Sequence, residues 1–338
     1  MSKGKGDCPY FVLIAVLACG ILAANAFLAG RPVAPPEGGR PASGRLFLAD
    51  DALISLRYSQ RLLEGKGLTW TDGEKVEGYS NLLWTLSCAA LGACGLDLIL
   101  AARLLGFLGM AAAVSAIVFA FRPVRGPPES DRILPAAFGA FALALSTPIA
   151  VWTIGGLEQP LLLGLLAWAV VLSYPSLDGE RVGARRLLTI GFLLAGVVLT
   201  RPEGALLAVL VCLAVAASRG KDGQPVRSLL ILAALPAAAY LGQLAFRMAY
   251  YGEWLPNTAQ VKLGLSRERL REGSVYVARG AAAVWPLLLA AAVALVAAAR
   301  DRYRRGRTGL LAAIALAWLV YIVLVGGTSS RLGGSSSW

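Results

Sequence analysis

Histidine is absent from this chain of 338 residues. Its absence excludes a Ser-His-Asp triad and most zinc sites, and it removes the commonest general base. Acid–base or metal chemistry must therefore depend on Asp, Glu, Lys or Tyr. Cysteine is also scarce, with five residues, and Cys88 and Cys94 are too widely spaced for a CxxC pair. We interpret the cysteines as small packing residues.

Charge is the second scarce property, because only 15% of the residues are charged while 57% are hydrophobic. A chain of this length with that composition is too apolar for a soluble domain and indicates a polytopic membrane protein. Long apolar runs with weak alternation exclude an outer-membrane barrel. The net charge of +12 is explained by short basic loops on the cytoplasmic side, so no nucleic-acid partner is expected.

The apolar runs predict an all-α protein with nine or ten membrane segments, since a spanning helix needs about 20 apolar residues. We expect these segments at 10–28, 82–95, 103–121, 133–151, 158–174, 187–200, 204–217, 228–247, 281–299 and 309–326. The first is expected to be a retained anchor and not a signal peptide, because no clear cleavage site follows it. Residues 1–327 would form this transmembrane domain, and the Ser/Gly-rich 328–338 a low-complexity tail.

Lysine and arginine predict the sidedness of the loops. The basic stretches 180–186, 218–227 and 300–307 are assigned to the cytoplasm. Alternation then places four polar stretches on the exoplasmic side of the membrane. These are a first loop at 29–80, two turns at 153–160 and 200–204, and a second loop at 248–280.

The region 81–121 admits two interpretations. If 122–132 is cytoplasmic, 81–121 must cross the membrane an odd number of times, although its length suggests two segments. Either 82–95 is a re-entrant or interfacial helix, or the 122–132 loop lies outside. The sequence leaves both open.

Residues 48–64 predict an amphipathic helix that lies along the membrane, headed by Asp50 and Asp51. Its apolar face would contain Leu53, Ile54, Leu56, Tyr58, Leu62 and Leu63. Its polar face would contain Ser55, Arg57, Ser59, Gln60, Arg61 and Glu64. One aspartate suffices as an N-cap, so the second carboxylate is left for function, although capping alone is the alternative.

Two further stretches gather aromatic and polar side chains, namely "TDGEKVEGYSNLLW" at 71–84 and "YYGEWLPNTAQVK" at 250–262. Interfacial anchoring of Tyr and Trp is one interpretation, and contact with a sugar is the other. A third stretch, "TRPEG" at 200–204, interrupts an apolar run. Arg201 either forms a local salt bridge with Glu203 or presents its guanidinium to a phosphate.

Taken in order, "DDALISLRYSQRLLEGKGLTW", "GEKVEGYSNLLW", "GGLEQPL", "TRPEG" and "YYGEWLPNTAQVK" resemble the GT-C superfamily of polytopic glycosyltransferases. More closely, they resemble the actinobacterial terminal arabinofuranosyltransferases that use decaprenyl-phosphate arabinose. The resemblance extends over about residues 8–327. It implies a GT-C fold, an exoplasmic active site, a polyprenyl-phosphate sugar donor presented from the membrane, and a glycan or glycolipid acceptor of the cell envelope.

In that family an acidic pair of the first exoplasmic loop carries the catalytic carboxylate, which corresponds here to Asp50 or Asp51. The pair is also a candidate site for Mg²⁺, Mn²⁺ or Ca²⁺. The predicted substrate-binding residues are Arg57, Tyr58, Glu77, Tyr79, Asn81, Glu158, Arg201, Glu203, Glu253, Trp254, Asn257, Gln260 and Lys262.

After Gly327 the sequence departs from the family and reads "TSSRLGGSSSW". We therefore expect the chain to be the donor-binding part of a longer enzyme. Two other functions are open, namely a transporter or flippase for a polyprenyl lipid and an inactive fragment. A flippase would favour ionisable residues near mid-span and two related halves, whereas these charges lie at predicted helix ends.

Overall fold

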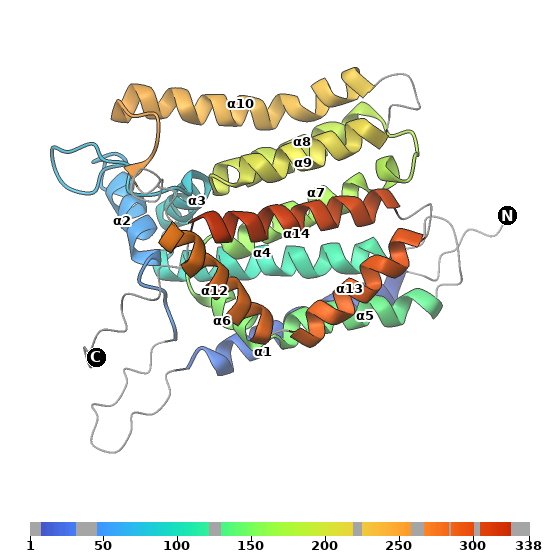
Figure 1. Ribbon diagram of the computed structural model, residues 1–338. Coiled ribbons are helices and arrows are strands. Elements are labelled where there is room, and N and C mark those ends of the chain that lie inside the picture. Colours follow the sequence, from blue (N-terminus) through green and yellow to red (C-terminus); the bar gives the residue numbers. More distant parts are fainter. Residues whose placement is uncertain are drawn as a thin grey trace, which may run out of the picture. The chain divides into compact units, whose positions relative to one another are not determined.

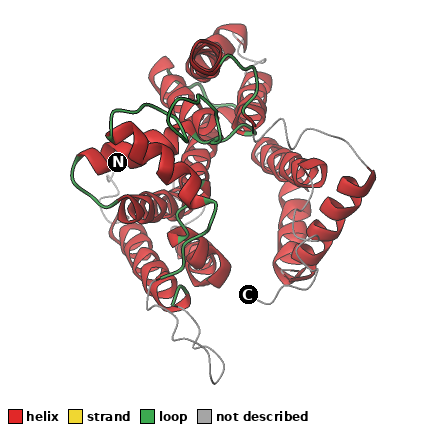
Figure 2. Ribbon diagram, turned by 90° about the vertical axis from the view of Figure 1, so that its left-hand side faces the viewer, coloured by secondary structure: helices red, strands yellow, loops and turns green. Residues whose placement is uncertain are grey.

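The computed structural model describes residues 8–31, 46–121, 130–218, 225–257, 267–283, 285–300 and 305–325. Within these ranges the chain forms thirteen helices and no strand (Figures 1 and 2). It divides into two compact units, which are described separately. The first contains Met1–Leu172 and Phe192–Pro202, and the second contains Ser173–Gly191 and Glu203–Trp338.

The first unit begins with α1, α2, α3 and α4, which cover Cys8–Ala29, Ala52–Leu63, Leu82–Ala93 and Leu98–Ala120. It continues with α5 (Ser130–Leu145) and α6 (Thr147–Ile154). Most of α7 (Gln159–Leu177) and the second half of α8 (Ala184–Thr200) complete it. The core lies where α1, α4, α5 and α6 pack, around residues such as Leu22, Val114 and Ala140, all fully buried.

Figure 1 shows α2 and α3 together at the end of α4 where that helix begins. Leu56 of α2, Trp84 and Cys88 of α3, and Ala102 of α4 form one buried cluster there. Asp97 begins α4 by accepting hydrogen bonds from the backbone N–H groups of Ile99 and Leu100, each at 3.0 Å.

The second unit contains the end of α7, the start of α8 and five further helices. These are α9 (Gly204–Ser218), α10 (Pro225–Tyr251), α12 (Arg267–Ala283), α13 (Trp285–Arg300) and α14 (Arg305–Val325). Arg307 joins the start of α14 to the end of α7, because its Nε donates to Asp178 at 2.8 Å and its Nη2 donates to the other carboxylate oxygen. The guanidinium also lies 4.4 Å from the centre of the Tyr174 ring.

Within the described ranges, five helices are long and apolar enough to cross a membrane, namely α1, α4, α7, α10 and α14. The pair α5 and α6 makes a sixth span if its 62° bend at Ser146 is counted within one crossing. The expectation of an all-α polytopic membrane protein is thus confirmed. Four of the ten expected segments form helices that are shorter than these candidate spans. They are α3, α8, α9 and α13, which have 12, 17, 15 and 16 residues. The expected loop 248–280 contains most of the helix α12, which the sequence did not predict.

The length of α3 bears on the two interpretations of 81–121. Twelve residues of α-helix extend about 18 Å, whereas the hydrocarbon core of a bilayer is about 30 Å thick. The helix packs against α2, and α4 alone has the length of a span in this region. The structure therefore favours the interfacial alternative for 82–95.

A close helix crossing holds α4 against α7. A Cβ atom on Gly109 would lie 2.6 Å from backbone atoms of Pro160 and Leu161, and a Cβ on Gly164 would meet the Gly109 carbonyl. Small residues allow such an approach, which dispersion forces then stabilise without any hydrophobic drive from water.

We expect Gly109→Ala to destabilise the protein by about 1–3 kcal/mol, because backbone atoms cannot move aside for the added methyl group. Gly20→Ala on α1 is the matched control, since its Cβ would have nothing within 4 Å. Thermal unfolding of the purified protein in detergent should give a lower Tm for the first variant and an unchanged or higher Tm for the second. Equal Tm values would contradict the close crossing.

Candidate active site

The short segment before α2 carries Asp50 and Asp51 and is held by its backbone. Phe47 N donates to the Gly30 carbonyl at 2.8 Å, and Ala49 N donates to the Gly155 carbonyl at 2.9 Å. These contacts join the segment to the end of α1 and to the turn after α6. The acidic pair is therefore placed by elements of the folded bundle.

Both carboxylates are exposed, and among the described residues no donor reaches either of them. Asp51 occupies the N-cap position of α2 but has helical dihedral angles, φ −61° and ψ −23°, and its side chain makes no capping hydrogen bond. A capping side chain normally requires an extended backbone at this position. Capping therefore accounts for neither carboxylate, and the interpretation of Asp50 or Asp51 as a simple cap is wrong in this structure.

A buried polar network lies beside the acidic pair, centred on Glu158 in the turn before α7. Its carboxylate accepts from Asn81 Nδ2 at 2.8 Å and from Arg201 Nη1 at 2.5 Å. Glu158 and Asn81 are 4% and 5% exposed, so the ion pair is shielded from solvent on the carboxylate side. Three predicted substrate-binding residues, from the start of α3, this turn and the end of α8, thus come together.

The network continues into α2 through hydroxyl groups. Ser55 Oγ and the Asn81 side-chain amide lie at hydrogen-bond distance, and Thr85 Oγ1 donates to Asn81 Oδ1 at 3.2 Å. Ser59 Oγ donates to the Thr85 carbonyl at 2.8 Å. Ser55 lies four residues after Asp51, which is about one helical turn. The network therefore reaches the head of α2, where the acidic pair lies.

The faces of α2 differ from the expected arrangement. The polar residues Ser55, Ser59 and Arg61 are buried, whereas Leu53 and Leu63 are 52% and 43% exposed. The serines are inside because Asn81 and the Thr85 carbonyl offer them hydrogen bonds. The predicted polar face is thus in part the protein-facing side of the helix.

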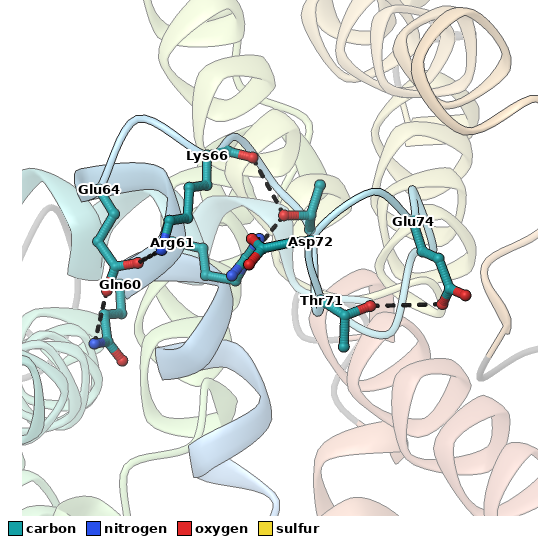
Figure 3. Close-up of polar contacts among 8 residues, drawn as sticks. Gln60, Arg61, Glu64, Lys66, Thr71, Asp72 and Glu74 are labelled. Atoms are coloured by element: carbon teal, nitrogen blue, oxygen red, sulfur yellow. Dashed lines mark hydrogen bonds and ion pairs between the residues drawn. The ribbon is translucent and has the colours of Figure 1, made fainter.

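The loop from residue 64 to 80 is fastened to α2 by Arg61 (Figure 3). Its Nε donates to Thr69 Oγ1 at 2.9 Å, and its Nη2 forms an ion pair with Asp72. The Arg61 side chain is 3% exposed and that of Asp72 is 80% exposed. The hydrogen bond and positive charge of Arg61 hold the pKa of the Asp72 carboxyl below its ordinary value.

Tyr58 fastens the second half of the same loop. Its hydroxyl donates to the Val76 carbonyl at 2.6 Å and accepts from Gly78 N at 2.8 Å, and its ring packs edge-on against Tyr79 at 4.9 Å. Burial raises the pKa of the Tyr58 hydroxyl, although the hydrogen bond from Gly78 opposes this effect. Tyr58 and Tyr79 are both buried, as is Glu77, while Arg57 is half-buried.

The remaining predicted site residues belong to the second unit or lie outside the described residues. Glu203 is 6% exposed, whereas Glu253 and Asn257 are exposed. Trp254 is 65% exposed, and its carbonyl accepts from Arg247 at 3.4 Å. Phe246, Tyr250 and Tyr251 form an aromatic group at the end of α10, with centroids 4.8–6.0 Å apart. Gln260 and Lys262 lie outside the described ranges, as does the tail 328–338.

Several side chains that organise this site were not singled out from the sequence as functional. Ser55, Arg61 and Thr85 looked like ordinary polar residues of an amphipathic or apolar helix. Their roles depend on partners 8 to 26 residues away in the chain, which no local pattern reveals.

Within the described ranges there is no group of three or more Cys, Asp or Glu side chains placed to hold a metal ion. Asp50 and Asp51 provide carboxylate oxygens, the donors that Mg²⁺, Mn²⁺ and Ca²⁺ prefer. These ions take six or more oxygen ligands, so two residues account for a minority of the coordination shell.

The chain is 31% identical, over 269 residues, to a terminal beta-(1->2)-arabinofuranosyltransferase of Mycobacterium tuberculosis. The match covers 75% of this chain and 41% of the mycobacterial protein, so the chain spans about two fifths of the length of its relative. No family model matches the sequence, and no solved structure matches it. The expected resemblance to terminal arabinofuranosyltransferases is thereby confirmed.

We expect Glu158→Gln to destabilise the protein by about 3 kcal/mol, because it breaks a mostly buried ion pair with Arg201. The 22% exposure of the Arg201 side chain keeps this cost at the low end of the range. Glu64→Gln is the control, because Glu64 pairs with Lys66 at an exposed position, where solvent and salt screen the interaction. Thermal unfolding should give a clearly lower Tm for Glu158→Gln than for Glu64→Gln. A Glu158→Gln Tm equal to the wild type would contradict the buried pair.

The ion pair between Arg61 and Asp72 should make the 64–80 loop sensitive to acid. Because the pKa of folded Asp72 is lowered, the pair stabilises the loop above pH about 4, and this contribution is lost as the pH falls through the lowered pKa. Hydrogen-exchange protection, corrected for intrinsic rates, should therefore decrease in acid for the wild type.

Asp72→Asn should reduce loop protection at neutral pH and remove most of its acid dependence. The control is Glu74→Gln, since exposed Glu74 contacts Thr71 only at 3.5 Å. An unchanged pH profile for Asp72→Asn would show that Arg61 does not hold the loop through this carboxylate.

Proposed function

We propose that the chain is, or forms part of, a membrane glycosyltransferase that transfers a sugar from a polyprenyl-phosphate donor to a glycan or glycolipid of the cell envelope. The observation that carries the proposal is the pair of exposed carboxylates at the head of α2, which have no partner among the described residues. The similarity to an arabinofuranosyltransferase supports the reaction class, and suggests arabinofuranose as the sugar.

In the proposed reaction an acceptor hydroxyl attacks the anomeric carbon of the donor from the face opposite the phosphate. The bond between that carbon and the phosphate oxygen breaks, and the polyprenyl phosphate leaves with the bonding electrons. Asp50, or Asp51 as the second candidate, takes the hydroxyl proton and so acts as the general base. The configuration at the anomeric carbon is inverted, because there is one displacement.

An exposed, unpaired carboxylate suits this role. A carboxylate that accepts strong hydrogen bonds is a weaker base and cannot approach the acceptor. Glu158 is engaged in this way by Asn81 and Arg201, whereas the acidic pair is not. We therefore assign proton transfer to the pair and substrate positioning to the network.

Positive charge is required where the phosphate departs. Arg201 and Lys262 are the proposed cations for it. Arg201 uses one terminal nitrogen for Glu158, and its side chain is 22% exposed. A divalent cation on the acidic pair would supply further positive charge when bound, with most of its ligands from water or the donor, and no step above depends on it.

The other predicted residues are proposed to contact the sugar, the acceptor or the loops that hold them. In the first unit these are Arg57, Tyr58, Glu77, Tyr79, Asn81 and Glu158. In the second unit or outside the described ranges they are Glu203, Glu253, Trp254, Asn257 and Gln260. Exposed Trp254 offers an aromatic face of the kind that stacks on sugars.

The proposed location is the exoplasmic side of a bacterial inner membrane. If α1 and α4 cross the membrane, the segment 46–97 between them lies on one side of it. The basic stretches 180–186, 218–227 and 300–307 are expected in the cytoplasm from their charge alone. The hydrogen bonds among Asn81, Glu158 and Arg201 support a single side for the three loops of the first unit.

Charge placement in the candidate spans favours transfer over lipid flipping. No charged residue occurs in α1 or α7, those of α10 and α14 lie near the helix ends, and Arg103 lies in the second turn of α4. A flippase would be expected to carry ionisable groups near mid-span. The transferase is accordingly the function that these residues support best.

Asp50→Asn and Asp51→Asn test the proposal directly. We expect one of them to reduce sugar transfer by about 10²–10⁴-fold while insertion and thermal stability are retained, since a carboxamide has the same shape but cannot take the proton. The assay uses protein in lipid nanodiscs, radiolabelled polyprenyl-phosphate arabinose and other sugars, and a panel of acceptors. Exposed Glu180→Gln is the control.

Donor binding is measured separately from transfer, because the chain spans 41% of its relative. Loss of transfer in one aspartate variant, with donor binding retained, supports that aspartate as the general base. Transfer at the wild-type rate in both variants overturns the assignment of the base to this pair. Translocation of the labelled lipid across the bilayer without sugar transfer would favour the flippase.

A further inference from the structure

Arg103 is the one charged residue in the sequence of α4, at the sixth position of a helix otherwise composed of apolar residues and one serine. A cation at such a position is costly in a membrane and requires polar partners. In the part of the chain that the structure describes, no carboxylate pairs with it. Its partners are the carbonyls of Leu46 and Phe47, which accept from Arg103 Nη2 at 2.8 and 3.3 Å.

These two carbonyls belong to the segment that carries the acidic pair, three and four residues before Asp50. The segment has hydrogen bonds on its N–H side from Phe47 to Gly30 and from Ala49 to Gly155. Arg103 supplies the hydrogen bonds on the carbonyl side. It therefore completes the attachment of a stretch that belongs to no helix.

Packing supports the same attachment. The Phe47 ring lies edge-on to Trp152 with centroids 5.6 Å apart, and the Leu48 side chain fills the space beside Gly156, which has a φ of +82°. A side chain on Gly156 would meet Leu48 and Ala52, so this turn must come close to the segment. The guanidinium adds the charge-assisted bonds to an otherwise apolar contact.

We propose that Arg103 is a positioning residue for Asp50 and Asp51, which orients the acidic pair by binding the backbone before it. The expected effect of Arg103 on the reaction rate rests on the proposed function. Its expected effect on the position of the segment before Asp50 does not. Placement of a general base within a fraction of an ångström matters to rate, since an error of about 1 Å costs about 10²-fold.

The permanent charge of the planar guanidinium suits arginine to this position. One nitrogen serves two successive carbonyls, and the planar group stays protonated at any physiological pH. The buried Nε–H has no acceptor among the described residues, so Arg103 keeps this position without its full set of hydrogen bonds. Lysine would offer one compact ammonium to the same carbonyls and should restore part of the effect.

The test has a spectroscopic and a kinetic arm. A nitroxide is attached at position 50 through Asp50→Cys in a background without the five native cysteines, and its mobility is compared with Arg103 present, as Arg103→Lys and as Arg103→Met. We expect Arg103→Met to narrow the lines of the electron paramagnetic resonance spectrum, which indicates a more mobile nitroxide. Arg103→Lys should give a spectrum of intermediate width. Arg185→Met is the control, because Arg185 is exposed on α8.

In the kinetic arm, with Asp50 intact, Arg103→Met should lower kcat by about 10²-fold and leave the donor KM unchanged, with partial recovery in Arg103→Lys. A raised donor KM with unchanged kcat would make Arg103 a phosphate contact and overturn the proposal. An unchanged spectrum in Arg103→Met would overturn it as well. If Arg103→Met does not fold, Arg103→Lys carries both arms.

Failure of the proposed function gives a different pattern. The wild type would then show no transfer with any donor, yet the nitroxide would still gain mobility in Arg103→Met, and the structural role of Arg103 would stand. A mobile nitroxide together with normal kcat in Arg103→Met would show that the position of the segment does not limit the reaction, and would overturn the inference.

Discussion

The requirement to neutralise a buried carboxylate organises the first unit of this protein. Glu158 is nearly inaccessible to water, and an unpaired charge at such a position would cost several kcal/mol. Arg201 supplies the opposite charge and Asn81 supplies a further donor, so the ends of two helices must come to the turn that carries Glu158. Ser55 then joins α2 to this network through a hydrogen bond with Asn81. One buried charge thus determines where four segments meet.

This network also separates the residues that hold the site from those available to act. Asn81, Glu158 and Ser55 are committed to one another, and Tyr58 and Arg61 are committed to the 64–80 loop. Their hydrogen-bonding capacity is used within the fold. The acidic pair has an ordered backbone and uncommitted side chains, which is the combination that general-base catalysis requires.

The sequence predicts helices and their approximate limits because apolar runs and breaks are local properties. It also predicts which polar loops share a side, since alternation of spans follows from their number and from basic residues. It does not predict partners. Arg201 was expected beside Glu203 or on a phosphate, whereas its ion pair with Glu158, 43 residues away, was not expected and follows from helix packing. For the same reason the burial of Ser55 and Ser59, and the uncapped backbone of Asp51, were not foreseen.

The exposed leucines of α2 suggest why the acidic pair lies where it does. Polar side chains attach the helix to the protein, and Leu53 and Leu63 remain on its outer side, where an interfacial helix contacts lipid. If α2 lies at the membrane interface, as the proposed function requires, its first turn would lie near the depth of the headgroups. The phosphate of a polyprenyl-linked sugar occupies that same depth, because its hydrocarbon chain stays in the bilayer. A soluble activated sugar would need no such placement, so an interfacial α2 is consistent with the lipid-linked donor of the proposed function.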